Sequence, residues 1–279
     1  MSECTLHIPA GRVAALVGPN GAGKTTLLHL AVGLLSPTSG TIEVLGLPLP
    51  AGPCQLGRVG FVAQETPTYS TLSVADHLRL GARLNPGWDR QLAESRIEQL
   101  GLDPNQRAGK LSGGQRAQLA LTLAIAKRPE FLLLDEPVSS LDPLARREFL
   151  QSLMEFAAQQ GVSVVLSSHL VGDLERVCDY LVLLTASRVR LSGDVDELLA
   201  THHRLTGPRR DRASLPTDQQ VIEASHTDRQ STLLIRTDAP IRDPSWTVEQ
   251  VNLEDLVLAY MRLANGPDHT RTPLSSVPS

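Results

Sequence analysis

One stretch near the start of the chain, residues 18–25 with the sequence GPNGAGKT, constrains the fold more than any other feature. It matches the pattern GxxxxGK[ST], and it lies between the apolar run 13–17 and a helical pattern that begins near residue 24. Glycines in such a stretch let successive backbone N–H groups converge on a phosphate, and the N-terminus of the following helix favours the same negative charge. The sequence therefore predicts a phosphate-binding loop between a strand and a helix.

Individual positions in this loop have expected tasks. The ammonium group of Lys24 is expected to reach the β- and γ-phosphates of a nucleotide, and the hydroxyl of Thr25 is expected to bind Mg²⁺. A glycine-rich turn without a ligand is a poor alternative, because a strand and a helix flank the motif. The nucleotide-binding residues that we expect in the loop are Gly18, Asn20, Gly21, Gly23, Lys24, Thr25 and Thr26.

Short apolar runs recur along the chain, and they are continuous rather than alternating. This is the pattern of strands that are buried on both faces of a sheet. Helical patterns lie between them, such as the one that opens at Asp142-Pro143 and closes near Gly161. The order predicts an α/β domain with a mainly parallel sheet. The expected strands are 13–17, 59–62, 131–134, 162–166 and 180–184.

The composition excludes several classes of protein. Lys and Arg number 26 against 30 Asp and Glu, whereas proteins that bind duplex nucleic acid usually carry a basic excess. Aromatic residues make up 3%, which argues against a protein that stacks single-stranded bases on rings, so we expect no nucleic-acid partner. The longest apolar runs, 119–126 and 180–186, fall short of the roughly 20 residues that a membrane span needs. The 3 cysteines form no CxxC pair, as is typical of reduced thiols in a cytosolic protein.

A second motif, Leu-Ser-Gly-Gly-Gln at residues 111–115, precedes the helical stretch 116–127. Ser112 and Gln115 have the spacing of a capping box, so a purely structural interpretation is available. Gly113 and Gly114 at a helix entrance would also make a second anion site, which a cap alone does not require. The local sequence leaves both interpretations open.

Polar residues end two of the expected strands. Asp135 and Glu136 follow the run 131–134, and this placement suits a carboxylate that holds Mg²⁺ and a second one that polarises a water molecule. A solvated turn is the alternative for this pair. Asp142 is expected to cap the helix that it precedes, whatever else it does. His169 follows the run 162–166, and a single histidine at a strand end is more often structural than catalytic.

In their order and spacing, these motifs resemble those of the nucleotide-binding subunit of an ATP-binding cassette (ABC) transporter, over residues 4 to 200. The resemblance implies that Gln64 senses Mg²⁺ and contacts the interface with the membrane domain. It also implies that Glu136 is a general base, that His169 contacts the γ-phosphate and that Asp142 communicates across a dimer. The residues that carry the resemblance are the loop 18–25, Gln64, the motif 111–115, the run LLLDEP at 132–137, Ser140-Leu-Asp142 and His169.

The resemblance implies a composite active site as well. The loop with Ser112, Gly113, Gly114 and Gln115 would reach the γ-phosphate that an opposite subunit holds. We therefore expect a second ATPase subunit, either identical to this chain or different from it. The expected reaction is hydrolysis of ATP to ADP and phosphate, with Mg²⁺ bound through Thr25, Gln64 and Asp135.

The expected domain organisation follows from this resemblance and from shifts in composition along the chain. We expect the ABC ATPase domain over 1–200, with a helical subdomain at about 66–128 that receives the membrane partner. Cys4, Leu6 and Ile8 alternate with polar residues like half of a hairpin, which predicts a truncated antiparallel β subdomain. A basic linker from residue 201 and a small α+β appendage are expected up to 264, followed by a disordered tail, 265–279. Within the appendage, the pattern predicts a hairpin over 220–237 and a helix from Asn252 to about 263.

The expected function is that of an ATPase subunit of a bacterial exporter whose permease is a separate polypeptide, bound peripherally at the cytoplasmic face of the membrane. A soluble ABC ATPase of translation or DNA maintenance is the alternative. Translation ATPases usually carry two cassettes and a basic linker, and DNA-maintenance ATPases split their motifs around a coiled coil. Neither feature is found in this sequence, which has no heptad run.

One feature departs from the family. Its subunits carry an aromatic residue for the adenine ring some two dozen residues before the loop lysine, and no residue before Lys24 is aromatic. Either the start codon is misplaced, the chain is truncated, or adenine is held by another side chain. The chain as printed is expected to bind ATP weakly and to discriminate little between adenine and guanine, because stacking of a base is worth about 1–3 kcal/mol.

Overall fold

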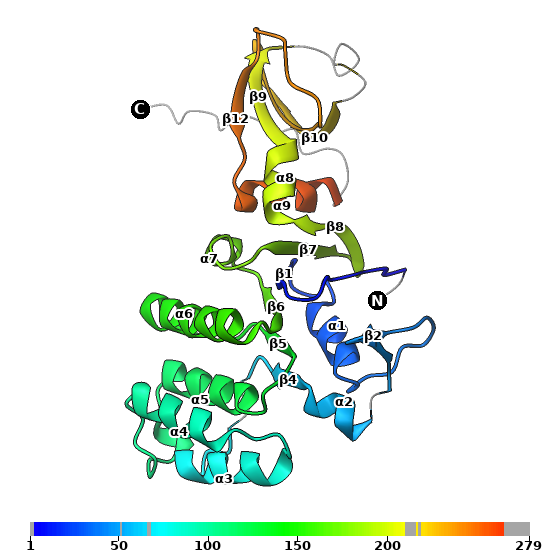
Figure 1. Cartoon of the computed structure of the whole chain (residues 1–279). Coiled ribbons are helices and arrows are strands. Elements are labelled where there is room, and N and C mark those ends of the chain that lie inside the picture. The colour runs from blue at the N-terminus through cyan, green and yellow to red at the C-terminus, as the bar shows by residue number, and fades with distance from the viewer. Residues whose placement is uncertain (1–2, 51, 66–67, 210–215, 217–218, 265–279) are drawn as a thin grey trace. The chain divides into compact units, whose positions relative to one another are not determined.

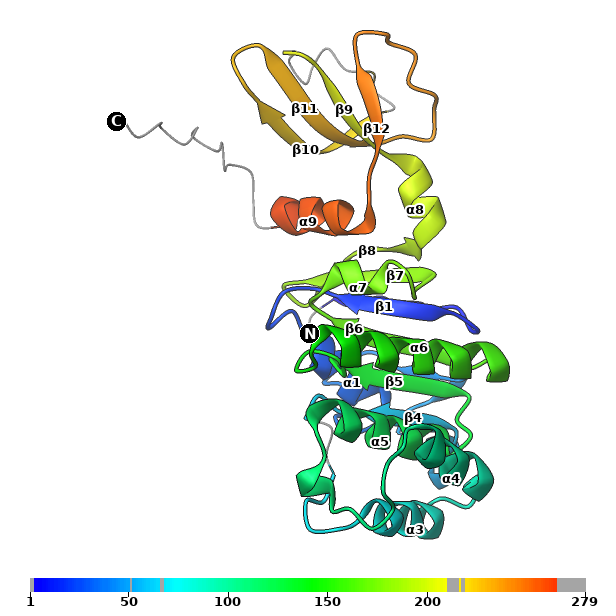
Figure 2. The same ribbon diagram turned by 90° about the vertical axis from the view of Figure 1, so that its left-hand side faces the viewer.

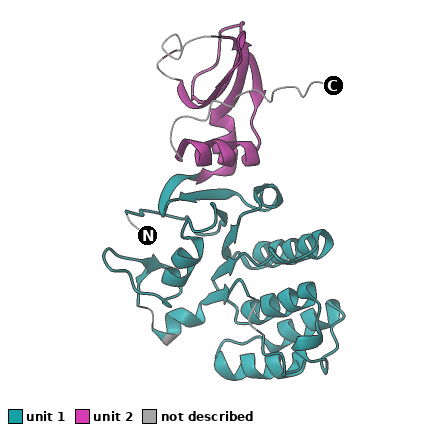
Figure 3. Cartoon of the chain, turned by 180° about the vertical axis from the view of Figure 1, so that it is seen from behind, with its two compact units in different colours: residues 1–192 teal, residues 193–279 magenta. Residues whose placement is uncertain are grey.

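The computed structural model describes residues 3–50, 52–65, 68–209, 216 and 219–264. The chain forms two compact units, residues 1–192 and 193–279 (Figure 3). The boundary that we expected at residue 200 lies inside the second unit. The reason is that helix α8 (Val195–Thr201) packs against strand β9 (His202–Pro208) and helix α9 (Leu253–Ala264). The expected tail, 265–279, lies outside the described residues.

The first unit is built on a sheet with the strand order β4-β5-β6-β1-β7-β8. Adjacent strands from β4 through β7 run parallel, as predicted for buried apolar runs. The last pair is a hairpin, because only two residues, Ala186 and Ser187, join β7 to β8, and both have positive φ angles, 48° and 63°. The strands are β1 (Val13–Val17), β4 (Val59–Val62), β5 (Phe131–Asp135), β6 (Ser163–Ser168), β7 (Tyr180–Thr185) and β8 (Arg188–Asp194).

Helices cover both faces of this sheet (Figures 1 and 2). Helix α1 (Lys24–Ala31) lies on one face and helix α6 (Pro143–Gln160) on the other. As predicted, Asp142 caps α6, and Gly161 ends it in the left-handed conformation that favours glycine. Helices α2 (Pro53–Gly57) and α7 (Val171–Leu174) are shorter. The core between these layers contains Leu16, Leu28 and Leu133, all almost fully buried.

Three helices form a separate part of the first unit: α3 (Val74–Leu84), α4 (Arg90–Gln99) and α5 (Gly113–Ile125). The three helices lie together (Figure 2). With a short 3₁₀ turn at Ala108–Lys110, they share a core that includes Val74 and Leu119. Ser73 and Asp76 cap α3 reciprocally, so the start of this helix is encoded locally. These helices lie within the range 66–128 that the sequence suggested for a helical subdomain.

The N-terminal strand, which we expected as half of a hairpin in a truncated β subdomain, is not formed. Residues 4–8 belong to no strand in the described part of the chain, and Cys4, Leu6 and Ile8 pack partly buried against the core instead. Their alternation reflects this packing rather than strand pairing. A two-stranded antiparallel sheet does occur further on, where β2 (Glu43–Val44) pairs with β3 (Leu47–Pro48).

The second unit is an antiparallel sheet in the order β10-β11-β9-β12 with α8 and α9. Strands β10 (Gln220–His226) and β11 (Gln230–Arg236) form the predicted hairpin. Helix α9 opens as predicted, because Asn252 Oδ1 accepts a hydrogen bond of 2.7 Å from the Asp255 N–H. Strand β12 (Thr247–Gln250) forms one edge of the sheet.

The expected linker after residue 200 was wrong for residues 202–208, which form β9. This strand pairs on both sides, with β11 and with β12, and Leu205 is fully buried. The glycine and the basic residue that suggested a linker have structural roles. A side chain at Gly207 would collide with the ring of Trp246, at 2.6 Å, and Arg204 pairs with Asp255 of α9 at 3.0 Å.

None of the helices among the described residues combines the length and the apolar character that crossing a membrane requires.

Candidate functional site

The loop between β1 and α1 has the backbone that the glycine-rich motif predicts. A Cβ atom at Gly18 would lie 2.2 Å from the carbonyl oxygen of Leu184 in β7, so only glycine fits beside that strand. Gly23 precedes α1 with a φ of 103°, and no side chain caps the helix there. The N–H groups of the first turn of α1 therefore stay available for an anion. The neighbouring side chains of Asn20, Thr25 and Thr26 are exposed.

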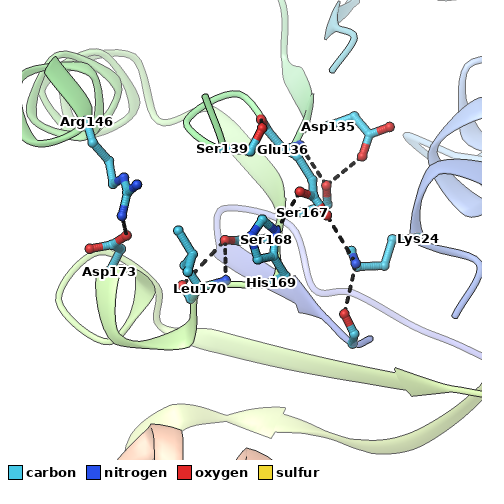
Figure 4. A network of polar contacts seen from close by, with 11 residues as sticks. Lys24, Asp135, Glu136, Ser139, Arg146, Ser167, Ser168, His169, Leu170 and Asp173 are labelled. Carbon is cyan, nitrogen blue, oxygen red and sulfur yellow. Dashed lines mark hydrogen bonds and ion pairs between the residues drawn. The ribbon is translucent and has the colours of Figure 1, made fainter. Parts of the chain in front are cut away.

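Lys24, the first residue of α1, is 5% exposed and turns back toward the sheet. Its Nζ donates to the carbonyl oxygen of Gly18 at 2.8 Å and lies 3.2 Å from Oε1 of Glu136 (Figure 4). Glu136 is itself 8% exposed. A buried charge is costly unless it is paired, so the ammonium and the carboxylate stabilise each other in this site.

The carboxyl ends of the parallel strands bring the remaining groups to the same edge of the sheet. Residues 135 and 167 are paired in register between β5 and β6, and residues 17 and 168 between β1 and β6. Ligands of open α/β sheets bind at this edge. The loop after β1, the carboxylates after β5 and the histidine after β6 are therefore neighbours, although they are far apart in the sequence.

The carboxylate of Glu136 lies between the side chains of Lys24 and His169. Nδ1 of His169 lies 2.7 Å from Glu136 Oε2, while Lys24 contacts Oε1 (Figure 4). The backbone of Glu136 has a φ of 44°, a left-handed conformation that is uncommon for a residue with a side chain. Strained backbone of this kind clusters at functional sites, where the surrounding structure imposes it. His169 is therefore part of the site rather than an isolated strand-end histidine.

Asp135 is 1% exposed, and its Oδ1 accepts a hydrogen bond of 2.6 Å from the hydroxyl of Ser167. Its other oxygen, Oδ2, has no hydrogen-bond partner within the residues that the structure describes. A buried carboxylate with one free oxygen fits a hard cation such as Mg²⁺. No cluster of three or more His, Cys, Asp or Glu forms a metal centre among the described residues.

The motif 111–115 makes the capping box that its spacing predicts. Ser112 Oγ accepts from the Gln115 N–H at 3.2 Å, and Gln115 Oε1 accepts from the Ser112 N–H at 3.0 Å. A Cβ atom at Gly114 would lie 2.9 Å from that of Ala145 in α6, so close helix packing requires this glycine. Among the described residues, no hydrogen bond or ion pair joins Ser112 or Gln115 to Lys24, Glu136 or His169.

Asp142 and Gln64 stand outside the cluster as well. Asp142 Oδ1 accepts from the N–H groups of Leu144 and Ala145, both at 3.0 Å, which is the helix cap that we expected. Gln64 lies exposed in the turn that follows β4. Roles for these two residues in the reaction therefore remain predictions.

Ser167 is a residue of the site that the sequence did not single out. It is fully buried at the end of β6, and its hydroxyl contacts both Asp135 and the backbone of Glu136. A polar residue at the end of an apolar run was the available signal, because buried hydroxyls are almost always hydrogen-bonded.

A glycine loop at a helix N-terminus, a buried lysine and two carboxylates at the carboxyl edge of a parallel sheet define a P-loop nucleotide-binding protein. Comparisons with known proteins place it more narrowly. The model of the ABC transporter family matches residues 1–139. The chain is 37% identical over 206 residues to an uncharacterized ABC transporter ATP-binding protein, YxlF, of Bacillus subtilis, covering 71% of this chain and 67% of YxlF.

Another relative and a solved structure are also ATP-binding proteins of ABC transporters. The thiamine import ATP-binding protein ThiQ of Shigella flexneri is 36% identical over 204 residues, covering 70% of this chain and 87% of ThiQ. A solved ATP-binding subunit of an ABC transporter matches with a TM-score of 0.63 and 30% identity, over 70% of this chain and 83% of that one. The chain therefore belongs to the ABC transporter family of ATP-binding proteins, and it is an ATPase subunit. ThiQ is named as an import protein, so these relatives do not support the expected exporter.

Proposed function

We propose that this chain hydrolyses ATP, with Mg²⁺, to drive translocation by a separate membrane subunit. The observation that carries the proposal is Glu136, a buried carboxylate held between Lys24 and His169 beside the phosphate-binding loop. The chemistry at this site is the same for either direction of transport, so the proposal is confined to ATP-driven translocation. It places the chain at the cytoplasmic face of the membrane, bound through its partner.

The side chains of the site suit the hydrolysis of a phosphoanhydride. When the triphosphate enters, its β- and γ-oxygens compete with Glu136 for the Lys24 ammonium, and the carboxylate is released to accept a proton from the attacking water. His169, now opposite a γ-phosphate oxygen, holds that group in place. Asp135, Thr25 and Gln64 would hold Mg²⁺, which supplies positive charge to the phosphates when it is bound.

The proposal includes a second ATPase subunit, either a copy of this chain or a related one. Helix α5 begins at Gly113, and Ser112 lies exposed in front of its first backbone N–H groups. Such a helix N-terminus suits the γ-phosphate of another subunit. Asp142, at the exposed start of α6, is suited to contact that subunit as well.

An apolar groove supports a membrane-subunit partner. It has a volume of about 330 Å³ and lies between the sheet edge at β4 and helix α5. Leu34 and Leu56 on its rim are 63% and 40% exposed, which is unusual for neighbouring leucines. Lys127 does not make the groove polar, because its Nζ donates to the carbonyl oxygens of Leu56 and Val59. We propose that an apolar segment of the membrane subunit binds in this groove.

The experiment is a substitution of the proposed base, Glu136→Gln, in the full chain. The amide keeps the shape of the side chain but cannot accept the proton of water, so ATP still binds while hydrolysis stops. We expect phosphate release to fall by about a hundredfold or more and an ATP-dependent dimer to accumulate on size-exclusion chromatography with Mg-ATP. Phosphate release at the wild-type rate would contradict the assignment of Glu136.

Binding of the proposed membrane subunit is tested in a separate experiment, by affinity capture from the native membrane fraction. The full chain should retain a polytopic membrane protein on affinity capture, and Leu34→Asp with Leu56→Asp should lose it while ATP hydrolysis by the isolated chain is unchanged. Leu263→Asp is a matched control, because Leu263 is 51% exposed, does not line the groove and belongs to the second unit, outside the helical subdomain expected to receive the partner. Retention of ribosomes or DNA instead of a membrane protein would favour the non-transport ATPases.

A further inference from the structure

We propose that Ser167 is a positioning residue for ATP hydrolysis, which sets the two carboxylates at the end of β5 through one hydroxyl group. The inference rests on the proposed roles of Asp135 and Glu136. Ser167 lies in β6 directly opposite Asp135 in the parallel register, and it has no exposed surface. The preceding residues of the strand, 164–166, are all apolar, so a hydroxyl at this position needs a reason.

The direction of both hydrogen bonds follows from their chemistry. The backbone N–H of Glu136 can only donate, so the Ser167 oxygen accepts there, at 2.8 Å. The hydroxyl proton is then directed to Oδ1 of Asp135, at 2.6 Å (Figure 4). A serine hydroxyl offers a single proton, and that proton is committed to the carboxylate. Ser167 therefore links the side chain of one carboxylate to the backbone of the other.

The bond to Asp135 decides which carboxylate oxygen faces the site. The terminal torsion of an aspartate is broad, so a carboxylate without a fixed partner can rotate. A hydroxyl-to-carboxylate bond of 2.6 Å is in the short range of charge-assisted hydrogen bonds, and it holds Oδ1 against β6. Oδ2 then remains the oxygen that is available for a cation. Without Ser167, we expect Asp135 to lose this orientation and to bind Mg²⁺ more weakly.

The bond to Glu136 supports a strained backbone. The φ of 44° is one that a residue with a Cβ atom adopts only where its surroundings impose it. Ser167 holds the N–H of this residue, and the hydroxyl of Ser139 donates to its carbonyl oxygen at 2.9 Å. Together they direct the side chain toward Lys24 and His169. Loss of the Ser167 hydroxyl is therefore expected to affect both Mg²⁺ binding and the proton-accepting step.

The test compares Ser167→Thr with Ser167→Val in the full chain, because the two side chains have nearly the same shape and only threonine keeps a hydroxyl. Ser167→Ala removes the hydroxyl without adding an atom, and it decides the question if the two larger side chains prevent folding. Ser163→Ala is the matched control. Ser163 begins the same strand, and its Oγ accepts from the Gly11 N–H at 2.8 Å, so its loss weakens β6 without touching the carboxylates.

Two quantities are measured: kcat for ATP hydrolysis, and the affinity for a non-hydrolysable ATP analogue with Mg²⁺ or with EDTA. Ser167→Val and Ser167→Ala remove a hydrogen bond to a charged carboxylate. We therefore expect their kcat to be about ten- to a hundredfold lower than that of Ser167→Thr and of the wild type. In these two variants, Mg²⁺ should no longer increase the affinity for the ATP analogue, whereas the affinity measured in EDTA should equal that of the wild type. Ser163→Ala should melt at a lower temperature but keep both quantities.

Equal kcat and equal Mg²⁺-dependent affinity for the valine and threonine variants would overturn the inference, as would wild-type values for Ser167→Ala. A parallel loss in Ser163→Ala would also overturn it, since the effect would then come from strand stability alone. Absence of ATP hydrolysis in the wild-type chain would contradict the proposed function instead. The two failures are therefore distinguishable.

Discussion

At the scale of single residues, the site depends on charges that are buried together. Lys24 and Glu136 are each less than a tenth exposed, and neither would be stable as an unpaired ion in that environment. Their atoms Nζ and Oε1 lie 3.2 Å apart, so each charge stabilises the other. In the proposed reaction, a phosphate would take the place of the carboxylate at the ammonium group, and the same pair would then serve both stability and chemistry.

Lys24→Ala is expected to reduce ATP hydrolysis by about a hundredfold or more, because a preorganised charge on the phosphates is lost. It should also destabilise the protein by about 1–3 kcal/mol at neutral pH, since the Glu136 carboxylate loses a buried partner. The double variant Lys24→Ala with Glu136→Gln should recover part of that stability, because no unpaired charge remains. Urea unfolding measures both effects, and a double variant less stable than Lys24→Ala would contradict the explanation.

Two of the three cysteines, Cys54 and Cys178, provide a second prediction at this scale. Burial, and then the neighbouring charge of Asp179, raises the pKa of Cys178 to about 12. Because the thiolate is the reactive form, roughly one in ten thousand of these groups is ionised at pH 8. Cys54 is exposed. We expect iodoacetamide to label Cys54 in the native protein and Cys178 only after unfolding, as read by mass spectrometry. Labelling of both at equal rates would show that the core around β7 opens readily.

At the scale of elements, two helices of the first unit begin with the same local device. Ser112 with Gln115 caps α5, and Ser73 with Asp76 caps α3. The caps are alike in energy, about 1 kcal/mol each, but only α5 is proposed to face another subunit's phosphate. The comparison of the two caps therefore separates helix stability from function.

Ser112→Arg should stop hydrolysis by blocking the phosphate of the opposite subunit, while the affinity of the monomer for nucleotide stays nearly unchanged. Ser73→Arg is the matched control, because it removes an equivalent cap and should lower the melting temperature by a similar amount. Its rate of hydrolysis should remain near that of the wild type. Equal rates for the two variants would argue against a composite site.

Helices α8 and α9 of the second unit are joined to β9 by a buried histidine. Nδ1 of His202 contacts the carbonyl oxygen of Leu198 at 2.6 Å, and Nε2 contacts the hydroxyl of Tyr260 at 2.9 Å. The carbonyl can only accept, so Nδ1 carries the proton and Nε2 accepts from the tyrosine. Burial lowers the pKa of His202, with further lowering by Arg236 and His203 and opposition from the Leu198 carbonyl and Asp238.

A histidine whose pKa is lower in the folded than in the unfolded protein stabilises the fold only while it is neutral. The contribution of His202 is therefore complete above pH 6.5, the ordinary pKa, and it is lost as the pH falls through the lowered value in the folded protein. We expect the second unit to unfold at lower urea concentration at pH 5 than at pH 7.5. His202→Asn should reduce this difference, and His226→Asn, at an exposed histidine of the same unit, is the matched control. An unchanged pH dependence in His202→Asn would contradict the assignment.

At the scale of the whole molecule, the residues of the proposed phosphate site all belong to the first compact unit, and the second has its own sheet and core. A ligand stabilises the part of a protein that binds it. We expect two unfolding transitions by calorimetry, one for each unit. A Mg-bound ATP analogue at a hundred times its Kd should raise the melting temperature of the first unit by about 5–10 °C and leave that of the second unchanged. An equal shift of both would show that the units unfold together.

Much of the site was determined by the sequence alone, because its parts are encoded locally. The glycines and the lysine of the loop 18–25 recur at a fixed local spacing, the Ser112 cap depends on a spacing of three residues, and the apolar runs become parallel strands with Asp135 and His169 at their ends. Local hydrogen bonds and continuous apolar runs act over a few residues, so they can be recognised in the sequence before any long-range contact is known.

Only the tertiary structure decided which of these parts meet. The contacts of Glu136 with Lys24 and His169 join segments that follow three different strands, and the role of Ser167 exists only because β5 and β6 pair in one register. Residues 202–208 looked like a linker and became a central strand, because β11 and β12 supply its hydrogen bonds and Trp246 packs on its glycine. Pairing and burial depend on partners that are distant in sequence, and for that reason no local pattern could reveal them.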